Sequence, residues 1–224
     1  FRRVLFRSIR FTKYEGTGND FVIIDNRSGY FPIEDNALVK KLCDRRFGIG
    51  ADGLICLEPK VGFDFYMRYY NSDGNISTMC GNGGRCITAF AAFLGIIKNN
   101  AKFLAIDGEH ESEILGSGIV SLKMKDVSGI EKSGNDFILD TGSPHFVRFV
   151  ENVSAINVFA EGRKIRQEER FGAKGINVNF VEHKNGNSTV KDPLSVCLQL
   201  FKGSGSPVLP IDKNHFVHPI RFRR

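Results

Sequence analysis

The chain has 224 residues, a hydrophobic fraction of 42% and a formal net charge of +6 at pH 7. This length allows one large domain or two small ones, and the hydrophobic fraction is enough for an ordinary buried core. Four arginines lie in the first ten residues and three in the last four, whereas the middle of the chain has no basic stripe interleaved with aromatic residues. The charge pattern therefore argues against nucleic acid as a partner.

Membrane and metal binding are not predicted either. No apolar run approaches the roughly 20 residues that a membrane-spanning helix needs, and the first residues lack the pattern of a secretory signal. No cysteines form a Cys-x-x-Cys pair, and no histidine lies at zinc-like spacing. We therefore expect a cytoplasmic protein without a structural metal. Its five cysteines are Cys43, Cys56, Cys80, Cys86 and Cys197.

The first part of the chain is predicted to hold four strands and a helix. Two of the strands form a hairpin around the polar turn Glu15–Asp20, whose glycines permit positive φ. Asp35 can cap the helix, which runs to about Arg46. The expected strands are Ile9–Lys13, Phe21–Asp25, Gly53–Leu57 and Phe63–Tyr70.

Cys80 stands one residue ahead of a glycine-rich turn that opens an apolar helix. Apolar side chains occupy nearly every side of this helix from Ile87 to Ile97, so we expect strands to wrap around it. The N–H groups of a first helical turn and the positive end of the helix dipole favour a thiolate and attract a carboxylate. This element therefore predicts both a base and an anion clamp.

Short strands separated by glycine or serine recur beyond residue 100. Gly129–Gly134 is predicted to be a domain linker, and Arg163–Arg170 a short charged helix. Ile176–Glu182 and Val190 frame a hairpin around Asn-Gly-Asn. The expected strands are at about 103–106, 112–116, 119–125, 136–140 and 145–150.

Five blocks, in this order, resemble the diaminopimelate epimerase family: Gly16–Val22, Arg46–Gly53, Tyr70–Gly74, Met79–Arg85 and Asp140–His145. The resemblance covers about residues 9–191. It implies an α+β fold of two similar domains, each a curved, mostly antiparallel, barrel-like sheet around a central α-helix. The substrate cleft is expected between the two domains.

The resemblance also implies a reaction. The family interconverts LL- and meso-diaminopimelate without a cofactor, on the route to lysine and peptidoglycan. Removing a weakly acidic α-proton without an electron sink requires a strong local base and stabilisation of the charge that develops on the carboxylate. The family uses two cysteines on opposite faces of the α-carbon. Cys80 resembles one of them, and His145 lies where the family keeps a histidine beside the cysteine pair.

Further residues resemble the family's substrate ligands. Asn19, Asn71 and Asn177 correspond to residues that hold the distal amino-acid group. Gly81 and Asn82 correspond to the clamp on the α-carboxylate. Taken singly, Asn19 and Asn71 would be ordinary turn residues; the ordered set of blocks favours a site. The implied partner is thus a small molecule, diaminopimelate, with no cofactor and with self-association as a homodimer.

The match ends at Lys191. Beyond it the family has a Tyr-Glu-Arg-Gly block and a Cys-Gly-Thr-Gly block, and neither is present; Cys197 lacks the following Gly-Thr-Gly. We expect residues 1–8 to be a non-native extension and 192–224 an unmatched, non-native tail without convincing periodicity. Residues 9–127 form the expected N-terminal domain, and 128–191 an incomplete C-terminal domain.

Three hypotheses follow from this comparison. The chain is a diaminopimelate epimerase, or a related cofactor-independent racemase or epimerase acting on proline or another amino acid, or a non-catalytic fragment with the epimerase fold. Loss of the second cysteine block favours inactivity, whereas the paired asparagines favour a substrate with a second amino-acid head. Ser143 stands where the family often has an asparagine, and it is not assigned a role.

Overall fold

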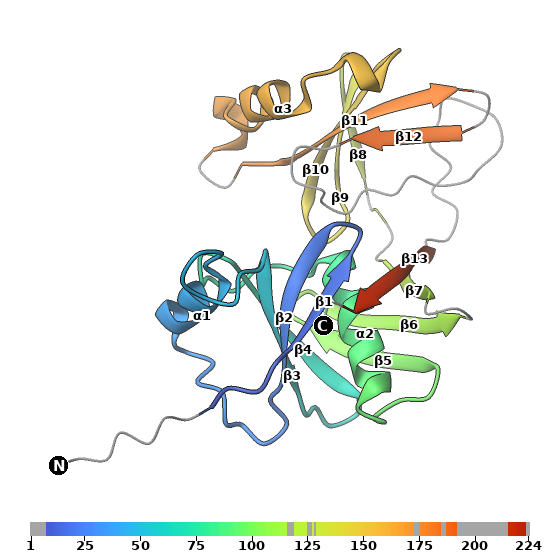
Figure 1. Ribbon diagram of the computed structural model, residues 1–224. Coiled ribbons are helices and arrows are strands. Elements are labelled where there is room, and N and C mark those ends of the chain that lie inside the picture. Colours follow the sequence, from blue (N-terminus) through green and yellow to red (C-terminus); the bar gives the residue numbers. More distant parts are fainter. Residues whose placement is uncertain are drawn as a thin grey trace.

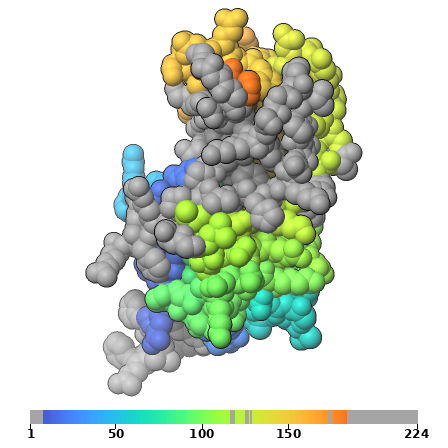
Figure 2. All heavy atoms as spheres, turned by 90° about the vertical axis from the view of Figure 1, so that its right-hand side faces the viewer, coloured from blue at the N-terminus to red at the C-terminus, as the bar shows by residue number. Residues whose placement is uncertain are grey.

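In the computed structural model, residues 8–115, 119–124, 127, 129–172, 175–184, 187–191 and 215–222 are described, with backbone alone from residue 184 onward. The described residues form a closed barrel followed by a five-stranded sheet (Figure 1). In the space-filling view the earlier residues form the lower body and the later residues the upper one (Figure 2). None of the described helices is long and apolar enough to cross a membrane.

The barrel has the strand order β1-β13-β7-β6-β5-β4-β3-β2. Most neighbours are antiparallel, and the pairs β2–β3 and β4–β5 are parallel. The strands are β1 (Thr12–Gly16), β2 (Asn19–Asp25), β3 (Gly53–Glu58), β4 (Phe65–Asn71), β5 (Asn100–Ala105), β6 (Gly108–Leu115), β7 (Ile119–Lys123) and β13 (His215–Phe222).

Helix α2 (Gly81–Phe93) fills the barrel, and most of its residues are buried. It packs against the strands of the wall, among them β1, β2 and β7. Cys86 and Ile87 are fully buried among aromatic and aliphatic side chains of the strands. The prediction of an apolar helix wrapped by strands is confirmed, because a helix that is apolar on every side needs walls on every side.

Helix α1 (Asn36–Cys43) covers the outer face of β2 and β3. The Asp35 carboxylate accepts a hydrogen bond from the Leu38 N–H at 2.9 Å, which confirms the predicted cap. Val39 and Cys43 pack in a second core cluster with Val22, Ile24, Leu54 and Cys56. This cover explains why β2 and β3 are apolar on both faces: one face lies against α2 and the other against α1.

The second sheet has the order β12-β11-β10-β9-β8. Helix α3 (Val158–Arg166) packs on one of its faces, where Phe146, Ile165 and Phe180 share a core cluster. Short 3-10 helices, η2 (Val153–Ala155) and η3 (Glu169–Phe171), flank α3. The strands are β8 (Ile130–Ser133), β9 (Asp136–Asp140), β10 (Pro144–Phe149), β11 (Asn177–Lys184) and β12 (Asn187–Lys191).

The predicted linker at Gly129–Gly134 is wrong. Residues Ile130–Ser133 form β8, which pairs with β9, and Gly134 has a φ of +65° in the turn between the two strands. The glycine signal marked a tight hairpin turn rather than a connection between domains. The charged helix also lies earlier than predicted, at Val158–Arg166 instead of Arg163–Arg170.

The segment without periodicity nevertheless contains a barrel strand. The backbone of β13 (His215–Phe222) pairs antiparallel with β1 on one side and with β7 on the other. Strand pairing uses backbone N–H and C=O groups, so it does not require an alternating side-chain pattern. Figure 1 shows this strand beside β1 and β7, where it closes the barrel around α2.

Candidate active site

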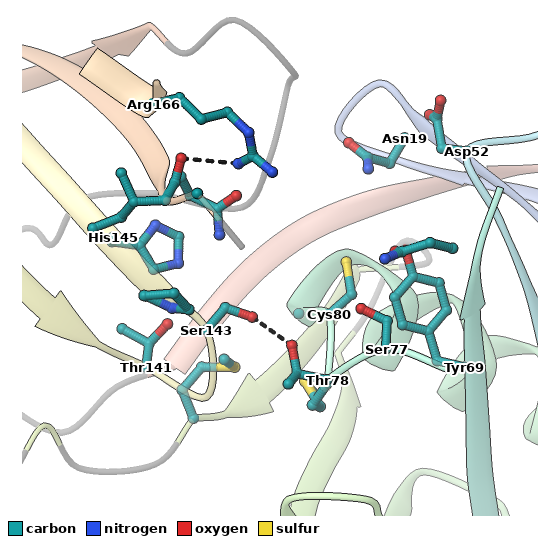
Figure 3. Close-up of a pocket in the computed structure, with 18 of the residues that line it drawn as sticks. Asn19, Asp52, Tyr69, Ser77, Thr78, Cys80, Thr141, Ser143, His145 and Arg166 are labelled. Carbon is teal, nitrogen blue, oxygen red and sulfur yellow. Dashed lines mark hydrogen bonds between the residues drawn. The ribbon is translucent and has the colours of Figure 1, made fainter. Parts of the chain in front are cut away.

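A cavity of about 400 Å³ lies between the barrel and the second sheet. Figure 3 shows Cys80 at the start of α2, and His145 across the cavity on the second sheet. The lining residues are Asn19, Asp52, Tyr69, Asn71, Ser72, Ser77, Thr78, Met79, Cys80, Gly81, Met124, Thr141, Ser143, Pro144, His145, Arg166, Gly175, Ile176 and Asn177. Every predicted site residue except Asn82 therefore lines one cavity.

Cys80 is the N-cap residue of α2, and its side chain makes no capping hydrogen bond. The first-turn N–H groups, which have no partner within a helix, point together with the positive dipole end toward this end of the cavity. Gly84 approaches β7 so closely that an added Cβ would lie 2.9 Å from the Leu122 Cδ2. The glycines thus let the helix N-terminus sit deep in the barrel, beside the cavity.

The other described cysteines are buried and have no place in the cavity. Burial raises the pKa of the Cys43 thiol to about 11, and it also raises the pKa values of Cys56 and Cys86. Of the four described cysteines, Cys80 alone is partly exposed. Cys197 lies outside the described residues. Among those that are described, no cluster of three or more His, Cys, Asp or Glu side chains could hold a metal.

Asn82 lies behind the cavity wall, and its side chain is buried. Its amide nitrogen donates to the Asn19 Oδ1 at 3.4 Å, and its oxygen accepts from the Arg85 guanidinium. Arg85 also donates to the Thr17 Oγ1 at 3.0 Å. The Asn82 side chain thus fixes Asn19 and the hairpin tip, which leaves its backbone as the part suited to an anion clamp.

Asn71, the last residue of β4, pairs in register with Gly53. Its N–H donates to the Asn75 carbonyl oxygen at 3.0 Å, which closes the turn after the strand. The next residue, Ser72, donates its N–H to the Asp52 carbonyl oxygen at 3.1 Å. The turn chemistry expected for this segment is therefore present and holds Asn71 at the cavity.

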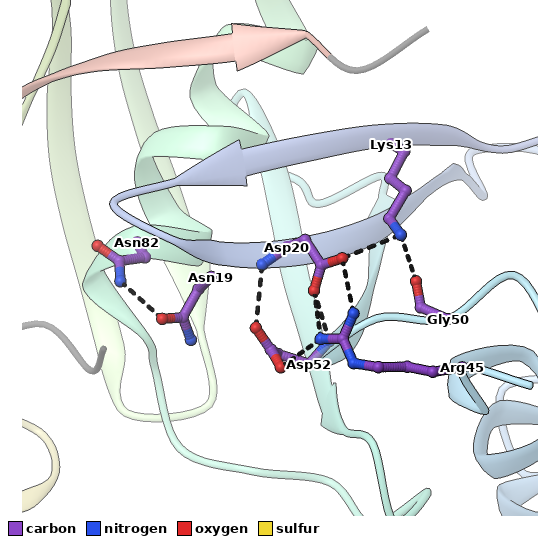
Figure 4. Close-up of polar contacts among 7 residues, drawn as sticks. All are labelled: Lys13, Asn19, Asp20, Arg45, Gly50, Asp52 and Asn82. Atoms are coloured by element: carbon purple, nitrogen blue, oxygen red, sulfur yellow. Dashed lines mark hydrogen bonds and ion pairs between the residues drawn. The ribbon is translucent and has the colours of Figure 1, made fainter. Parts of the chain in front are cut away.

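An ion-pair network braces the adjoining wall (Figure 4). The buried Asp20 carboxylate lies 2.9 Å from the Lys13 Nζ and 2.8 Å from the Arg45 guanidinium. Arg45 also reaches Asp52 at 2.7 Å. Burial by itself would raise the pKa of Asp20, but the hydrogen bonds from Arg45 and Lys13 outweigh burial and lower it. The network places the Asp52 carboxylate at the cavity.

His145 lies on β10, and its side chain is 2% exposed. Its Nδ1 is 3.2 Å from the Asn179 amide nitrogen on β11. Burial lowers the pKa of His145 to about 4, only partly opposed by the charge of Asp140. The imidazole is therefore neutral at pH 7. Asn177 lies beside it, because the two residues are register partners in the parallel pair β10–β11.

Sequence reasoning missed several lining residues. The Arg166 guanidinium donates to the Ile176 carbonyl oxygen at 2.9 Å and crosses Gly175, where an added Cβ would lie 2.9 Å from it. No local pattern in the sequence distinguishes Arg166 from its charged neighbours. Asp52, in contrast, lies within the block at 46–53 that resembles the epimerase family, and Thr78 directly precedes the block at 79–85, so both positions carried a usable signal.

The model of the diaminopimelate epimerase family matches residues 11–128. The diaminopimelate epimerase of Flavobacterium psychrophilum is 57% identical over 169 residues, which cover 75% of this chain and 66% of that protein. This chain belongs to the diaminopimelate epimerase family. A second family member, from Chlorobaculum tepidum, is 42% identical over 188 residues, 81% of this chain and 71% of the relative.

The chain spans slightly less than two thirds, 66%, of the Flavobacterium epimerase. Its fold is shared beyond the epimerases of diaminopimelate. A hydroxyproline epimerase from Agrobacterium vitis superposes with a TM-score of 0.59 at 11% identity, over 83% of this chain and 70% of that one. At that identity the likeness concerns the fold alone, and it agrees with the predicted architecture of curved sheets around a central helix.

Proposed function

We propose that this diaminopimelate epimerase family member acts at the α-carbon of 2,6-diaminopimelate and interconverts the LL and meso forms without a cofactor. The observation that carries the proposal is the position of Cys80, which is the N-cap residue of α2 and lines the same cavity as His145. A thiol at a helix N-terminus has its thiolate form stabilised by the dipole. Cys80 is then the base that removes the α-proton.

The same helix end serves as the carboxylate clamp. The N–H groups that begin at Gly81 donate hydrogen bonds to the α-carboxylate, and these bonds strengthen as negative charge moves onto the carboxylate during proton removal. Donors aimed at developing charge are each worth about 10²- to 10³-fold in rate. The protein thus replaces a cofactor's electron sink with backbone dipoles in a partly closed cavity.

The far end of the cavity is suited to a second amino-acid head. Asn19, Asn71 and Asn177 offer amide donors and acceptors there, as the family resemblance implies. Arg166 adds a cation from α3, and Asp52 adds a carboxylate from the opposite wall. We assign Arg166 to the distal carboxylate and Asp52 to the distal ammonium, since an arginine fork matches a carboxylate.

Inversion also requires a group that returns a proton to the opposite face of the α-carbon. The sequence lacks the family's Cys-Gly-Thr-Gly block, and among the described residues Cys80 is the cysteine that lines the cavity. If Cys80 is the one acid–base group at the α-carbon, the α-proton exchanges with solvent and configuration is retained; inverted product would show that a second group delivers a proton to the opposite face. The competing hypothesis is a non-catalytic fragment, which would exchange nothing.

The test is loss of the α-proton signal of meso-diaminopimelate in D₂O, followed by ¹H NMR with the full chain. We expect exchange that Cys80→Ala abolishes and that Cys86→Ala, a buried cysteine outside the cavity, retains. Chiral analysis of the product separates exchange from inversion. Equal exchange in both variants would remove Cys80 from its role, and no exchange in the unsubstituted chain would favour the fragment hypothesis.

A related racemase activity is the second candidate. The hydroxyproline epimerase shares the fold, but the charged pair Arg166 and Asp52 at the far end of the cavity suits a substrate with a second charged head. Proline, hydroxyproline and diaminopimelate are compared in the same exchange assay. Preferential exchange of proline would reject diaminopimelate as the substrate.

Assembly and location belong to the same proposal. We propose a cytoplasmic homodimer, with a first domain at residues 9–127 and a second at 128–191, as the family resemblance implies. Sedimentation equilibrium of the full chain tests the dimer, for which a mass of 25.0 kDa per chain sets the reference. A species at the mass of one chain at all micromolar concentrations would reject it.

A further inference from the structure

Asn179 is a buried polar residue that the proposed reaction does not use. Its side chain is 0% exposed, on the face of β11 opposite the core cluster of Phe146 and Phe180. Its Oδ1 has no hydrogen-bond partner among the described residues. A buried amide whose oxygen makes no hydrogen bond destabilises a protein core compared with an apolar side chain. The contacts of the amide nitrogen are therefore the place to look for the reason that an asparagine stands here.

The amide nitrogen of Asn179 has three neighbours. It lies 3.1 Å from the Phe146 carbonyl oxygen, 3.3 Å from the Asn177 carbonyl oxygen and 3.2 Å from the His145 Nδ1. Carbonyl oxygens only accept hydrogen bonds. The Asn179 atom beside them must therefore be the NH₂ group, because the amide oxygen would be repelled by both carbonyls. An amide nitrogen does not accept hydrogen bonds, so Nδ1 of His145 cannot donate to it and takes the acceptor role; the two hydrogens of the NH₂ group are shared among the three acceptors.

We propose that Asn179 is a positioning residue that holds His145 in the Nε2–H tautomer, so that the imidazole presents a hydrogen-bond donor to the cavity. The role of this tautomer in catalysis rests on the proposed epimerase function. His145 lines the cavity while Asn179 does not. The Nδ1 edge thus faces the sheet, and Nε2 is the ring nitrogen left for the cavity.

This tautomer gives His145 a defined task. A neutral imidazole has one N–H and one lone pair, and here the lone pair is committed to Asn179. Nε2 already carries its proton, so it cannot remove one from the Cys80 thiol or from substrate. It donates instead to an anion in the cavity, either the Cys80 thiolate or the substrate carboxylate. Burial keeps the pKa of His145 near 4, so the ring stays neutral at pH 7.

The tautomer can be measured directly. Long-range ¹H–¹⁵N spectra of the full chain labelled at histidine distinguish a protonated from an unprotonated ring nitrogen, and His145→Gln assigns the signal. At pH 7 we expect His145 to show protonated Nε2 and unprotonated Nδ1. Protonated Nδ1 in the unsubstituted chain would overturn the proposal. The spectrum needs neither substrate nor turnover, so its outcome is separate from failure of the proposed epimerase activity.

Asn179→Asp supplies the matched perturbation. An ionised carboxylate accepts from Nδ1–H, so Nδ1 should become protonated. Exchange of the α-proton should then fall by about 10²-fold, because the neutral ring no longer presents Nε2–H to the cavity. Asn157→Asp, at the N-cap of α3, is the control and should leave the His145 spectrum unchanged. A folded Asn179→Asp protein with unprotonated Nδ1 at pH 7 to 9 would reject the role of Asn179. If that variant does not fold, the unsubstituted spectrum still decides.

Discussion

The Thr78 Oγ1 lies 2.9 Å from the Ser143 Oγ, a hydrogen bond between residues 65 positions apart that joins the barrel to the second sheet (Figure 3). Thr78 is two residues before Cys80, and Ser143 is two residues before His145. The segments that carry the proposed base and the proposed donor are thus tied directly to one another across the cavity.

A double-mutant cycle of Thr78→Val and Ser143→Ala tests this tie. Because the pair is exposed to solvent, we expect a coupling free energy of about 0.5–1 kcal/mol. Each variant should need a twofold to fivefold higher substrate concentration for half-maximal exchange. Each single variant should show the same loss as the double variant. Strictly additive effects would mean that the two hydroxyls act independently.

The stability of the protein should fall as the pH falls from 6.5 toward 4 because of His145. Its pKa in the unfolded chain is near 6.5, and burial lowers it to about 4 in the folded state. Below pH 6.5 the unfolded chain binds a proton that the folded state does not. The stabilisation is therefore complete above pH 6.5, and about 3 kcal/mol of it is lost by pH 4.

Urea unfolding of the unsubstituted chain and of His145→Gln at pH 7, 5.5 and 4.5 measures this contribution. The free energy of unfolding should decrease more steeply in the unsubstituted chain than in the variant. Parallel curves for the two proteins would show that His145 titrates alike in both states.

Asp20→Asn should destabilise the barrel wall. The carboxylate accepts from Lys13, from Arg45 and from the Asp52 N–H at 3.1 Å. The amide leaves two cations with weaker partners, but both are partly exposed, so we expect a loss of about 1–3 kcal/mol in the free energy of unfolding. Arg27→Ala, which removes an exposed pair with Asp25, is the control and should change it by less than about 0.5 kcal/mol.

Gly53→Ala should be more harmful than a surface glycine substitution. The added Cβ would lie 2.5 Å from the Tyr69 Cε2 and 2.6 Å from the Tyr70 carbonyl oxygen. The Tyr70 backbone cannot move away without disturbing its strand, so we expect the free energy of unfolding to fall by about 1–3 kcal/mol. We also expect displacement of Tyr69 from the cavity. Gly129→Ala, where an added Cβ meets no described residue within 4 Å, should leave the melting temperature nearly unchanged. Equal melting temperatures for both variants would contradict the close approach.

Arg166→Met should weaken substrate binding. It removes the guanidinium while keeping an unbranched side chain beside Gly175. We expect at least a tenfold higher half-saturating concentration of diaminopimelate, with a smaller effect of Arg166→Lys, which keeps the charge without the fork. Unchanged saturation by diaminopimelate in Arg166→Met would show that another group holds the distal carboxylate.

The sequence alone determined the local elements that carry strong signals. The Asp35 cap, the buried helix behind Cys80 and the turn after Asn71 follow from residues within a few positions of one another, and the structure contains all three. The five sequence blocks likewise led to the family, which the comparisons show. Short-range chemistry is legible in a sequence because the partners are neighbours along the chain.

Only the tertiary structure decided which distant groups meet. The contact between His145 and Asn179 depends on the parallel register of β10 and β11 over 34 residues, and the contact between Thr78 and Ser143 depends on how two sheets face each other. The backbone of β13 pairs with β1 and β7, which lie far from it in the sequence. Strand register and sheet placement are set by the packing of the whole core, so no local pattern of residues encodes them.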